Sequence, residues 1–206
     1  MKRCIIACGA PVNNYDRIKK LLREDDFFVC CDSGLRHAEK LCRTPDLIVG
    51  DFDSWERPSL PVETIVLPRE KDDTDGVYAV REMVKREYDE FILIGAAGER
   101  LDHTLVNVSV LLMLHSLGKK AVLIDDFSQM EIVGRERVFI DDSYSYFSLL
   151  AVEGNVSGVY ERNVKYPLEN AEITSEYQYG TGNEVLPGKV GEVWAEGGRL
   201  LLIKVF

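Results

Sequence analysis

Short apolar runs alternate with segments of helical period over the first 127 residues, and this alternation limits the fold more than any other feature. The runs are continuous rather than alternating in polarity, as expected for strands that are covered on both faces. Strands that alternate with helices form an open, mostly parallel sheet with flanking helices. We therefore predict an α/β fold for this part. The expected strands are residues 3–8, 27–31, 47–49, 64–67, 91–94 and 121–124.

Segments between these runs place apolar residues on one face of a helix. Gly118 ends the last of them, with Lys119 and Lys120 beside it, which is typical of the C-terminal end of a helix. The apolar positions are Ile18, Leu21 and Leu22, then Leu35, Ala38, Leu41 and Cys42, then Val77, Val80, Met83 and Val84, and finally Leu101, Leu105, Val108 and Leu112.

The pattern changes near Phe127, after which helical periodicity is replaced by short strand-like pieces separated by Gly, Asn and Pro. These pieces are residues 138–140, 144–152, 172–177, 189–195 and 200–206. Short strands with frequent turn residues are typical of a small sandwich or barrel. We therefore expect an α/β domain over residues 1–127 and an all-β sandwich domain over residues 128–206.

Charge and cysteine content exclude some functions. A formal net charge of −10 argues against a nucleic-acid binder or a protein that binds anionic membranes, both of which need a basic face. The longest apolar run, around residues 105–114, is too short to span a bilayer. The apolar run after Lys2 and Arg3 is shorter than the core of a signal peptide. Five cysteines without a Cys-x-x-Cys pair favour reduced thiols and a cytoplasmic location over a zinc site.

Acidic, basic and glycine residues follow most of the predicted strands, and ligands of open α/β sheets bind beyond the carboxyl ends of the strands. Asp51 and Asp53 follow one buried strand at alternate positions, so that both can turn toward one hard cation. Aspartate is common in loops, so that one such residue alone means little. Acidic residues and glycines that recur in several of these loops indicate a ligand-binding site. The other residues in these positions are Asp32, Ser33, Gly34, Arg69, Lys71, Asp72, Asp73, Asp75, Gly95, Gly98, Arg100, Asp102, His103, Asp125 and Asp126.

This mixture suits a magnesium polyphosphate site, because Mg²⁺ prefers carboxylate, phosphate and water oxygens. Lys71 and Arg100 can donate to phosphate oxygens, and Gly95, Gly98 and the start of the following helix can offer backbone N–H groups. No Gly-x-x-x-x-Gly-Lys-Ser/Thr motif is present, which excludes an ordinary P-loop.

Several of these residues also have a purely structural interpretation. Asp32 and Thr74 can be helix N-caps, and we prefer that interpretation for Thr74. Asp73 and Asp126 are expected to be solvated loop charges. His103, in the first turn of a helix, is more often structural or exposed than catalytic. His37 and His115 are expected on helix surfaces.

An ordered set of motifs resembles the thiamin pyrophosphokinase family over essentially the whole chain. The motifs in the first part are Asp32-Ser33-Gly34, Gly50-Asp51-Phe52-Asp53-Ser54, Lys71-Asp72-Asp73-Thr74-Asp75 and the stretch from Gly95 to His103. Those in the second part are Tyr166-Pro167-Leu168 and Gly180-Thr181-Gly182-Asn183. Each motif is weak by itself, whereas the ordered set is specific.

The resemblance implies that ATP and Mg²⁺ bind to the α/β domain, and that the chain is a homodimer with thiamin at the subunit interface. It implies transfer of the diphosphoryl group of ATP to the thiamin hydroxyl, which gives thiamin diphosphate and AMP. The residues implied to bind ATP are Asp32, Ser33, Gly34, Asp72, Thr74, Gly95, Gly98 and His103, and those implied near thiamin are Thr181, Gly182 and Asn183. The implied catalytic residues are Lys71, Arg100, Asp102 and the magnesium ligands Asp51, Asp53 and Asp75.

The sequence departs from the family pattern in the late motif, where Gly182 replaces a serine and Val185 stands where an aromatic residue is expected. A stacking partner for thiamin can instead come from Tyr177, Tyr179 or Trp194. The alternative functions are a magnesium-dependent phosphohydrolase, a diphosphokinase that acts on another alcohol, and a non-catalytic nucleotide or thiamin sensor.

Overall fold

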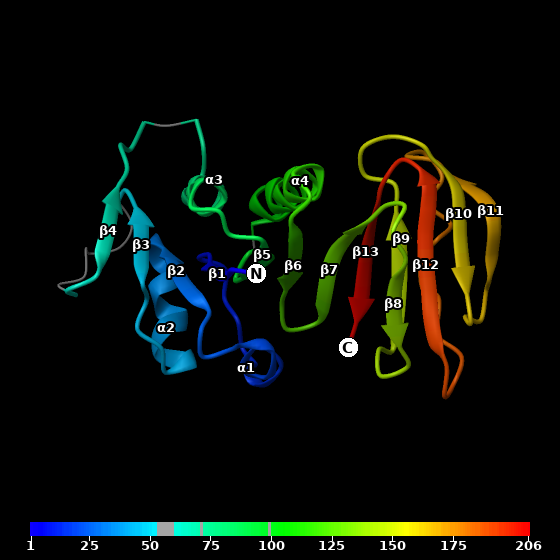
Figure 1. Cartoon of the computed structure of the whole chain (residues 1–206), viewed down its shortest axis with the longest axis horizontal. Coiled ribbons are helices and arrows are strands. Elements are labelled where there is room, and N and C mark those ends of the chain that lie inside the picture. Colours follow the sequence, from blue (N-terminus) through cyan, green and yellow to red (C-terminus); the bar gives the residue numbers. More distant parts are fainter. Residues whose placement is uncertain (53–59, 71, 99) are drawn as a thin grey trace. The chain divides into compact units, whose positions relative to one another are not determined.

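The computed structural model describes residues 1–52, 60–70, 72–98 and 100–206. Two of the expected site residues, Asp53 and Lys71, lie outside these residues. The chain forms two compact units, Met1–Asp126 and Phe127–Phe206 (Figure 1). The first unit is α/β and the second is all β, which confirms the predicted fold class.

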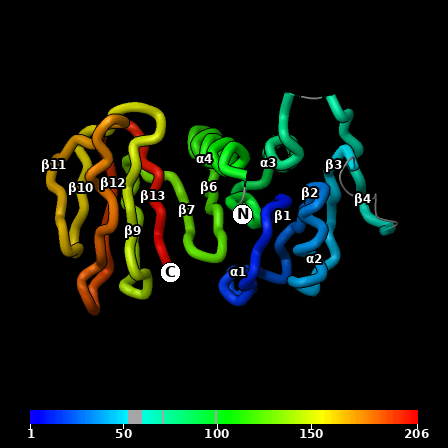
Figure 2. Tube along the Cα trace, turned by 180° about the vertical axis from the view of Figure 1, so that it is seen from behind, coloured from blue at the N-terminus to red at the C-terminus, as the bar shows by residue number. Residues whose placement is uncertain are grey.

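A parallel sheet forms the centre of the first unit, and its strands lie in the order β4, β3, β2, β1, β5, β6 (Figures 1 and 2). In the central strand β1, Ile5 lies opposite Phe28 on one side and Ile92 on the other. Its residues from Cys4 to Ala7 are fully buried, as the continuous apolar run predicts. The strands are β1 (Arg3–Ala7), β2 (Phe27–Cys31), β3 (Leu47–Gly50), β4 (Glu63–Val66), β5 (Glu90–Ile94) and β6 (Lys120–Ile124).

The helices lie on both faces of this sheet, and their positions confirm the predicted helical segments. They are α1 (Asp16–Leu21), α2 (Leu35–Leu41), α3 (Asp75–Lys85) and α4 (Leu101–Ser116), with a 3-10 turn, η1 (Asp32–Gly34), directly after β2. The chain moves outward from β1 to β4 and then returns to β5 and β6. Because parallel crossovers are right-handed, α1 and α2 cover one face, and α3 and α4 the other. The connections after β1 and β5 therefore leave toward opposite faces, which is the point where such sheets bind ligands.

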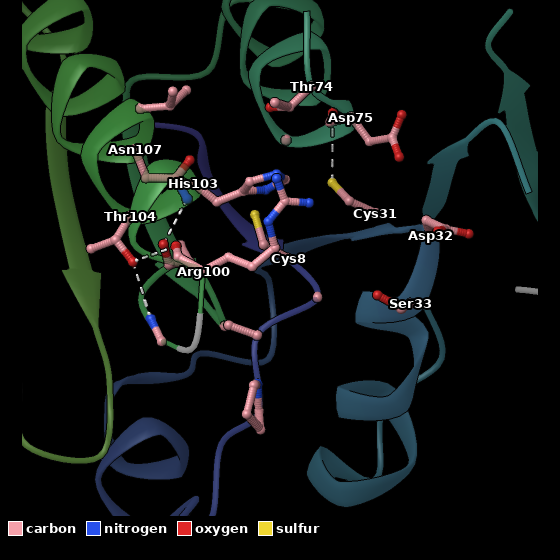
Figure 3. A pocket seen from close by; sticks show the side chains of 18 of the residues that line it. Cys8, Cys31, Asp32, Ser33, Thr74, Asp75, Arg100, His103, Thr104 and Asn107 are labelled. Carbon is pink, nitrogen blue, oxygen red and sulfur yellow. Dashed lines mark hydrogen bonds between the residues drawn. The ribbon is translucent and has the colours of Figure 1, made fainter. Parts of the chain in front are cut away.

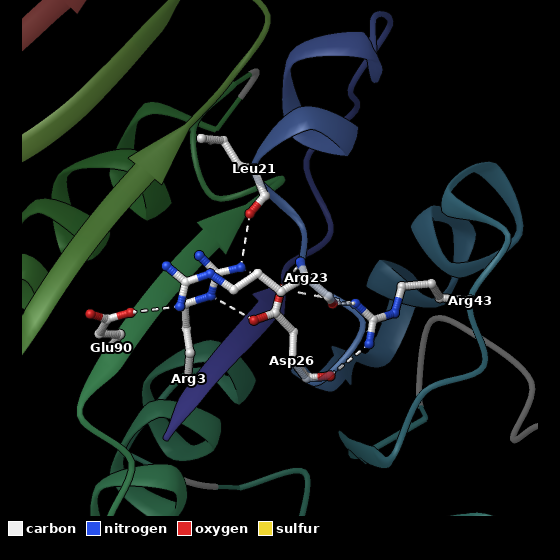
Figure 4. Close-up of polar contacts among 6 residues, drawn as sticks. All are labelled: Arg3, Leu21, Arg23, Asp26, Arg43 and Glu90. Atoms are coloured by element: carbon white, nitrogen blue, oxygen red, sulfur yellow. Dashed lines mark hydrogen bonds and ion pairs between the residues drawn. The ribbon is translucent and has the colours of Figure 1, made fainter. Parts of the chain in front are cut away.

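A buried ion cluster joins strands and helices at the amino ends of β1 and β2 (Figure 4). The carboxylate of Asp26, just before β2, accepts hydrogen bonds from Arg3 of β1 at 2.5 and 2.7 Å. Arg3 also donates to the carbonyl oxygen of Leu21 at the end of α1, at 2.8 Å. Arg43, which follows α2, donates to the carbonyl oxygen of Asp26 at 2.6 Å. Asp26 and Arg3 together thus tie β1 and β2 to the ends of α1 and α2.

The second unit contains two antiparallel sheets, with strand orders β7–β13–β9 and β11–β10–β12–β8. Buried side chains from both sheets form one apolar core, which includes Val133 and Phe147 from the first sheet and Ile140 and Val159 from the second. This arrangement is a small sandwich. The strands are β7 (Ser128–Val133), β8 (Val138–Asp141), β9 (Tyr146–Leu150), β10 (Val156–Arg162), β11 (Leu168–Ile173), β12 (Val190–Gly197) and β13 (Leu200–Val205).

The structure corrects some predicted strands of the second unit. Strands β7 and β10 were not predicted, because polar residues interrupt β7 and Gly158, in the left-handed region at φ +62°, interrupts β10. The strand expected over residues 172–177 lies earlier, at Leu168–Ile173, and Tyr177 instead closes a turn with Thr174. Among the helices of the described residues, none has both the length and the apolar character needed to cross a membrane.

Candidate active site

A cavity of about 540 Å³ lies beyond the carboxyl ends of β1, β2, β3 and β5. It is at the switch point between β1 and β5, where residues Cys8–Pro11 and Gly95–Gly98 leave the sheet. The expected site residues that line it are Asp32, Ser33, Asp51, Thr74, Asp75, Gly95, Gly98, Arg100 and His103. Figure 3 shows that the labelled side chains among them come from the connection after β2 and from the starts of α3 and α4. The structure therefore brings together residues that are far apart in the sequence.

Three carboxylates, those of Asp32, Asp51 and Asp75, share this cavity. They follow β2, follow β3 and begin α3, respectively. Ionised carboxylates around one cavity repel each other unless a cation lies between them. The acidic side of the cavity therefore favours a ligand that contains or brings a cation.

The turn that carries Asp32 packs directly against the end of β1. A Cβ atom on Gly34 would lie 2.1 Å from the carbonyl oxygen of Ala7, so that only glycine fits there. Asp32 has φ +40°, a conformation that Asp tolerates better than most residues. Asp32 is the first residue of η1 and Cys31 occupies its N-cap position, which corrects the capping interpretation of Asp32.

Thr74 caps α3, as we preferred from the sequence. Its side-chain oxygen accepts a hydrogen bond from the backbone N–H of Val77 at 3.3 Å. The cap fixes the start of the helix, so that Asp75 in the first turn is positioned at the cavity. Thr74 itself also lines the cavity.

Arg100 and Asp102 form an exposed ion pair at the start of α4. Arg100 Nη2 lies 2.5 Å from Asp102 Oδ2, and Arg100 Nε lies 3.2 Å from Oδ1. The guanidinium group lowers the pKa of Asp102 to about 2, so that this carboxylate stays ionised at neutral pH. Asp102 does not line the cavity, whereas Arg100 does. Asp102 therefore orients Arg100 from outside the cavity.

Side chains of α4 hold the connection after β5. Thr104 Oγ1 accepts a hydrogen bond from the backbone N–H of Gly98 at 3.2 Å, and Asn107 Nδ2 donates to the carbonyl oxygen of Ala96 at 2.6 Å (Figure 3). Asn107 is buried. The backbone at Gly95–Gly98 is thus fixed by its own following helix.

His37 is fully buried rather than on a helix surface, which corrects the expectation from the sequence. Its Nε2 lies 2.9 Å from the carbonyl oxygen of Cys8, and its Nδ1 lies 2.7 Å from the hydroxyl of Tyr15. Burial lowers the pKa of His37. The helical pattern of α2 did not reveal this position, because the contacts come from residues far along the chain.

Asp73 and Asp126 are partly exposed loop charges, which agrees with the expectation, and both also make polar contacts. Asp73 accepts a hydrogen bond from Arg81 at 2.5 Å. The carboxylate of Asp126 accepts from the backbone N–H groups of Asn13 and Asn14, at distances of 2.9 to 3.0 Å. Asp126 therefore anchors the chain that leaves β1.

Other residues at the cavity were not anticipated from the sequence. Among the described residues, Arg36 is a second cationic side chain at the cavity besides Arg100. Its place directly after the Asp32-Ser33-Gly34 motif is the signal by which it could have been identified as a site residue. Cys8 and Cys31 also line the cavity at the ends of β1 and β2. Of the other residues expected to bind ATP, Gly34 and Asp72 do not line it, although Gly34 packs against the end of β1.

The donor set at the cavity fits Mg²⁺ that is held together with a polyphosphate. Mg²⁺ needs only one or two protein carboxylates, because phosphates and waters complete its octahedron. Asp51 and Asp75 supply two, and Asp53 lies outside the described residues. Within the described residues there is no cluster of three or more acidic, histidine or cysteine side chains that would hold a metal alone. The substrate would therefore have to contribute ligands.

The residues expected near thiamin lie in the second unit, where Thr181 and Gly182 are exposed and Asn183 is buried. Asn183 Nδ2 donates to Glu161 and, at 2.8 Å, to the carbonyl oxygen of Tyr166. Asn183 Oδ1 accepts from the N–H groups of Tyr166 and Glu184 at 3.1 and 2.9 Å.

An asparagine side chain has two donor hydrogens and two acceptor lone pairs, and these contacts use all of them. The side chain of Asn183 therefore links its own segment to Glu161 and Tyr166, and its amide is fully occupied within the protein.

The aromatic residues considered as stacking partners differ in accessibility. Trp194 is stacked on Tyr160, with ring centroids 4.7 Å apart, and it lies under the guanidinium groups of Arg137 and Arg162. Tyr177 and Tyr179 form a tilted pair with centroids 5.2 Å apart, and both are exposed. The two tyrosines are therefore better placed than Trp194 to meet a ligand.

Comparison with known proteins places these features in a family. Residues 18–123, just over half of the chain, match the family model described as thiamin pyrophosphokinase, catalytic domain. The chain is 25% identical to the thiamine pyrophosphokinase of Bacillus subtilis (strain 168) over 205 residues, which cover 96% of each protein.

Solved structures show the same fold. The crystal structure of thiamine pyrophosphokinase from Bacillus subtilis superimposes with a TM-score of 0.87 at 24% identity, covering 99% of each chain. That of thiamin pyrophosphokinase from Geobacillus thermodenitrificans gives a TM-score of 0.84 at 25% identity, covering 100% of this chain and 98% of the other.

Proposed function

The chain belongs to the thiamin pyrophosphokinase family, and we propose that it transfers the diphosphoryl group of ATP to the hydroxyl of thiamin, with thiamin diphosphate and AMP as products. The observation that carries the proposal is that Asp32, Asp51 and Asp75, from separate connections, line one cavity together with Arg36 and Arg100. This combination of carboxylates and cations suits a magnesium-bound polyphosphate.

Asp51 and Asp75 would hold Mg²⁺ in this proposal, together with Asp53. When bound, Mg²⁺ neutralises phosphate charge and holds phosphate oxygens in a fixed geometry. Arg100, oriented by Asp102, faces the charge that grows on the phosphate oxygens during transfer. Lys71 is proposed to act in the same way.

Diphosphoryl transfer requires mainly positioning and charge compensation. A bond forms between the thiamin hydroxyl oxygen and the β-phosphorus, and the bond from the β-phosphorus to the oxygen that bridges the α and β positions breaks. The bridging oxygen leaves with AMP. The hydroxyl proton passes to a carboxylate, for which we propose Asp75.

Thiamin is proposed to bind near Thr181 and Gly182 of the second unit in a homodimer. Their exposed backbone and the exposed pair Tyr177 and Tyr179 support this placement, because aromatic faces attract the cationic thiazolium ring. We also propose a cytoplasmic location, since the five cysteines are free.

Product analysis tests the proposed function. The protein is incubated with ATP, Mg²⁺ and thiamin, and AMP and thiamin diphosphate are expected in equal amounts. Rapid hydrolysis of ATP without thiamin would identify a phosphohydrolase instead. Binding of ATP without turnover would indicate a sensor, and AMP formation only with another alcohol would indicate a different acceptor. Membership of the family favours transfer to thiamin over these alternatives.

A further inference from the structure

The imidazole of His37 lies directly beneath both backbone segments that form the floor of the cavity. It is fully buried, and its Nε2 lies 2.9 Å from the carbonyl oxygen of Cys8, which follows β1. A Cβ atom on Gly95, which follows β5, would lie 2.6 Å from the same nitrogen. Cys8 and Gly95 both line the cavity, whereas His37 does not. The ring therefore contacts these two segments from outside the cavity.

The contacts of His37 determine its tautomer. A carbonyl oxygen can only accept a hydrogen bond, so that Nε2 must carry the hydrogen that points to Cys8. Nδ1 of the neutral ring is then an acceptor, and the hydroxyl of Tyr15 donates to it at 2.7 Å. Burial lowers the pKa of His37, which agrees with a neutral ring.

Tyr15 ends a segment that begins at the cavity. Pro11 lines the cavity, and the backbone N–H groups of Asn13 and Asn14 are held by the carboxylate of Asp126 beyond β6. The hydroxyl of Tyr15 then meets His37. The chain from β1 to α1 is thus fixed at its middle by Asp126 and at its end by His37.

We propose that His37 is a positioning residue for the nucleotide, whose Nε2–H holds the backbone at Cys8 and Gly95 in the conformation that accepts the polyphosphate. The inference rests on the proposed function for the identity of the ligand. A histidine that served only the stability of the core would leave nucleotide affinity unchanged in a variant that folds. The two roles can therefore be separated by kinetics.

Substitutions that keep or remove the Nε2–H test the role. Glutamine places an amide N–H close to the position of Nε2, whereas asparagine places it close to Nδ1. We expect His37→Asn and His37→Phe to raise KM for ATP about tenfold, because a buried carbonyl oxygen loses its donor. His37→Gln should stay within about threefold of wild type by the same reasoning. KM for thiamin should stay unchanged, and His115→Asn serves as a matched control on α4.

Calorimetric titration with ATP and Mg²⁺ reports the same property without turnover. Wild-type protein that neither binds nor uses ATP would contradict the proposed function, and this inference with it. Wild-type binding together with unchanged binding in folded His37→Asn would overturn the inference alone, as would equal losses in His37→Gln and His37→Asn. If the His37 variants do not fold, Tyr15→Phe decides, because without the hydroxyl that donates to Nδ1 the neutral ring is no longer held in the tautomer that carries the hydrogen on Nε2. We then expect a raised KM for ATP, and an unchanged KM in that variant would overturn the proposal.

Discussion

Asp51 is the residue on which the proposed chemistry depends most directly. It follows β3, lines the cavity and is one of the proposed magnesium ligands. We expect Asp51→Asn to lower kcat about a hundredfold or more, because a weakened hold on Mg²⁺ would reduce the stabilisation of developing negative charge, and the loss of one such stabilising contact has effects of this size. The fold should remain intact, since Asp51 is only partly buried.

Steady-state turnover at saturating Mg²⁺ checks this prediction. Asp73→Asn is the matched control, because Asp73 is also an aspartate in a connection after a strand, and it pairs with Arg81 instead of lining the cavity. Turnover close to wild type in Asp51→Asn would remove Asp51 from the metal site.

Glu161 is a buried carboxyl group whose titration should affect stability. Burial raises its pKa to about 7, although the hydrogen bond from Asn183 acts in the opposite direction. The folded state therefore binds the proton more tightly than the unfolded state. Its contribution to stability is complete below about pH 4.5 and is lost as the pH rises through about 7.

Glu161→Gln should remove this loss, because glutamine stays neutral and can still accept from Asn183. We expect the variant to exceed wild type in free energy of unfolding at pH 8.5 by on the order of 3 kcal/mol, and to match it near pH 4.5. Urea unfolding at both pH values measures the difference. Glu184→Gln, which removes a surface ion pair with Lys165, should not reproduce it. The same pH dependence in wild type and Glu161→Gln would disprove the role of Glu161.

At the scale of the secondary structure elements, the Asp26 cluster connects β1 and β2 to α1 and α2. Asp26→Asn leaves Arg3 with less compensation for its charge in a nearly buried position. Breaking a buried ion pair from one side costs about 3–5 kcal/mol, and we expect a loss of this order in the free energy of unfolding. Chemical denaturation checks the value.

Activity should be unaffected under conditions in which Asp26→Asn is folded, because the cluster lies at the amino ends of the strands and the cavity lies beyond their carboxyl ends. Glu63→Gln is a suitable control, since it weakens an exposed ion pair with Arg86. An equal loss of unfolding free energy in both variants would show that the buried Asp26 cluster stabilises the fold no more than an exposed ion pair does.

The elements of the first unit could be predicted because their signals are local. A strand covered on both faces must be apolar throughout, and β1 and β2 satisfy this with every residue from Cys4 to Ala7 and from Phe28 to Cys31. Strand β10 was missed because Gly158 interrupts it and because a charged residue, Glu161, occupies one of its buried positions. The burial of its residues depends on contacts with the facing sheet, and these contacts cannot be read from the local sequence.

The candidate site could be predicted to a similar extent. Asp32, Asp51 and Asp75 were identified because the carboxyl ends of parallel strands meet at one edge, whatever the lengths of the connections. The supporting contacts could not be predicted. Tyr15 and His37 are separated by 22 residues, and Asn13 and Asp126 by 113, so that neither pair leaves a mark in the local sequence.

At the scale of the whole molecule, an acidic protein is proposed to bind an anionic nucleotide. The formal net charge is −10, and the cavity itself contains several carboxylates. Binding of ATP should therefore depend strongly on Mg²⁺, because the cation cancels repulsion between carboxylates and phosphates. We expect chelation of divalent cations to abolish turnover and to weaken ATP binding in calorimetric titration. Tight ATP binding in the presence of a chelator would contradict this dependence.

The most direct test of the central claim follows the phosphates of ATP during transfer. ATP labelled at both the β- and γ-phosphorus is mixed with the protein, Mg²⁺ and thiamin, and the products are separated after one turnover. Intact transfer of the diphosphoryl group predicts that both labels appear in thiamin diphosphate and that AMP carries none. Labelled ADP together with thiamin monophosphate, or labelled inorganic phosphate formed without thiamin, would contradict the assignment of the cavity to diphosphoryl transfer.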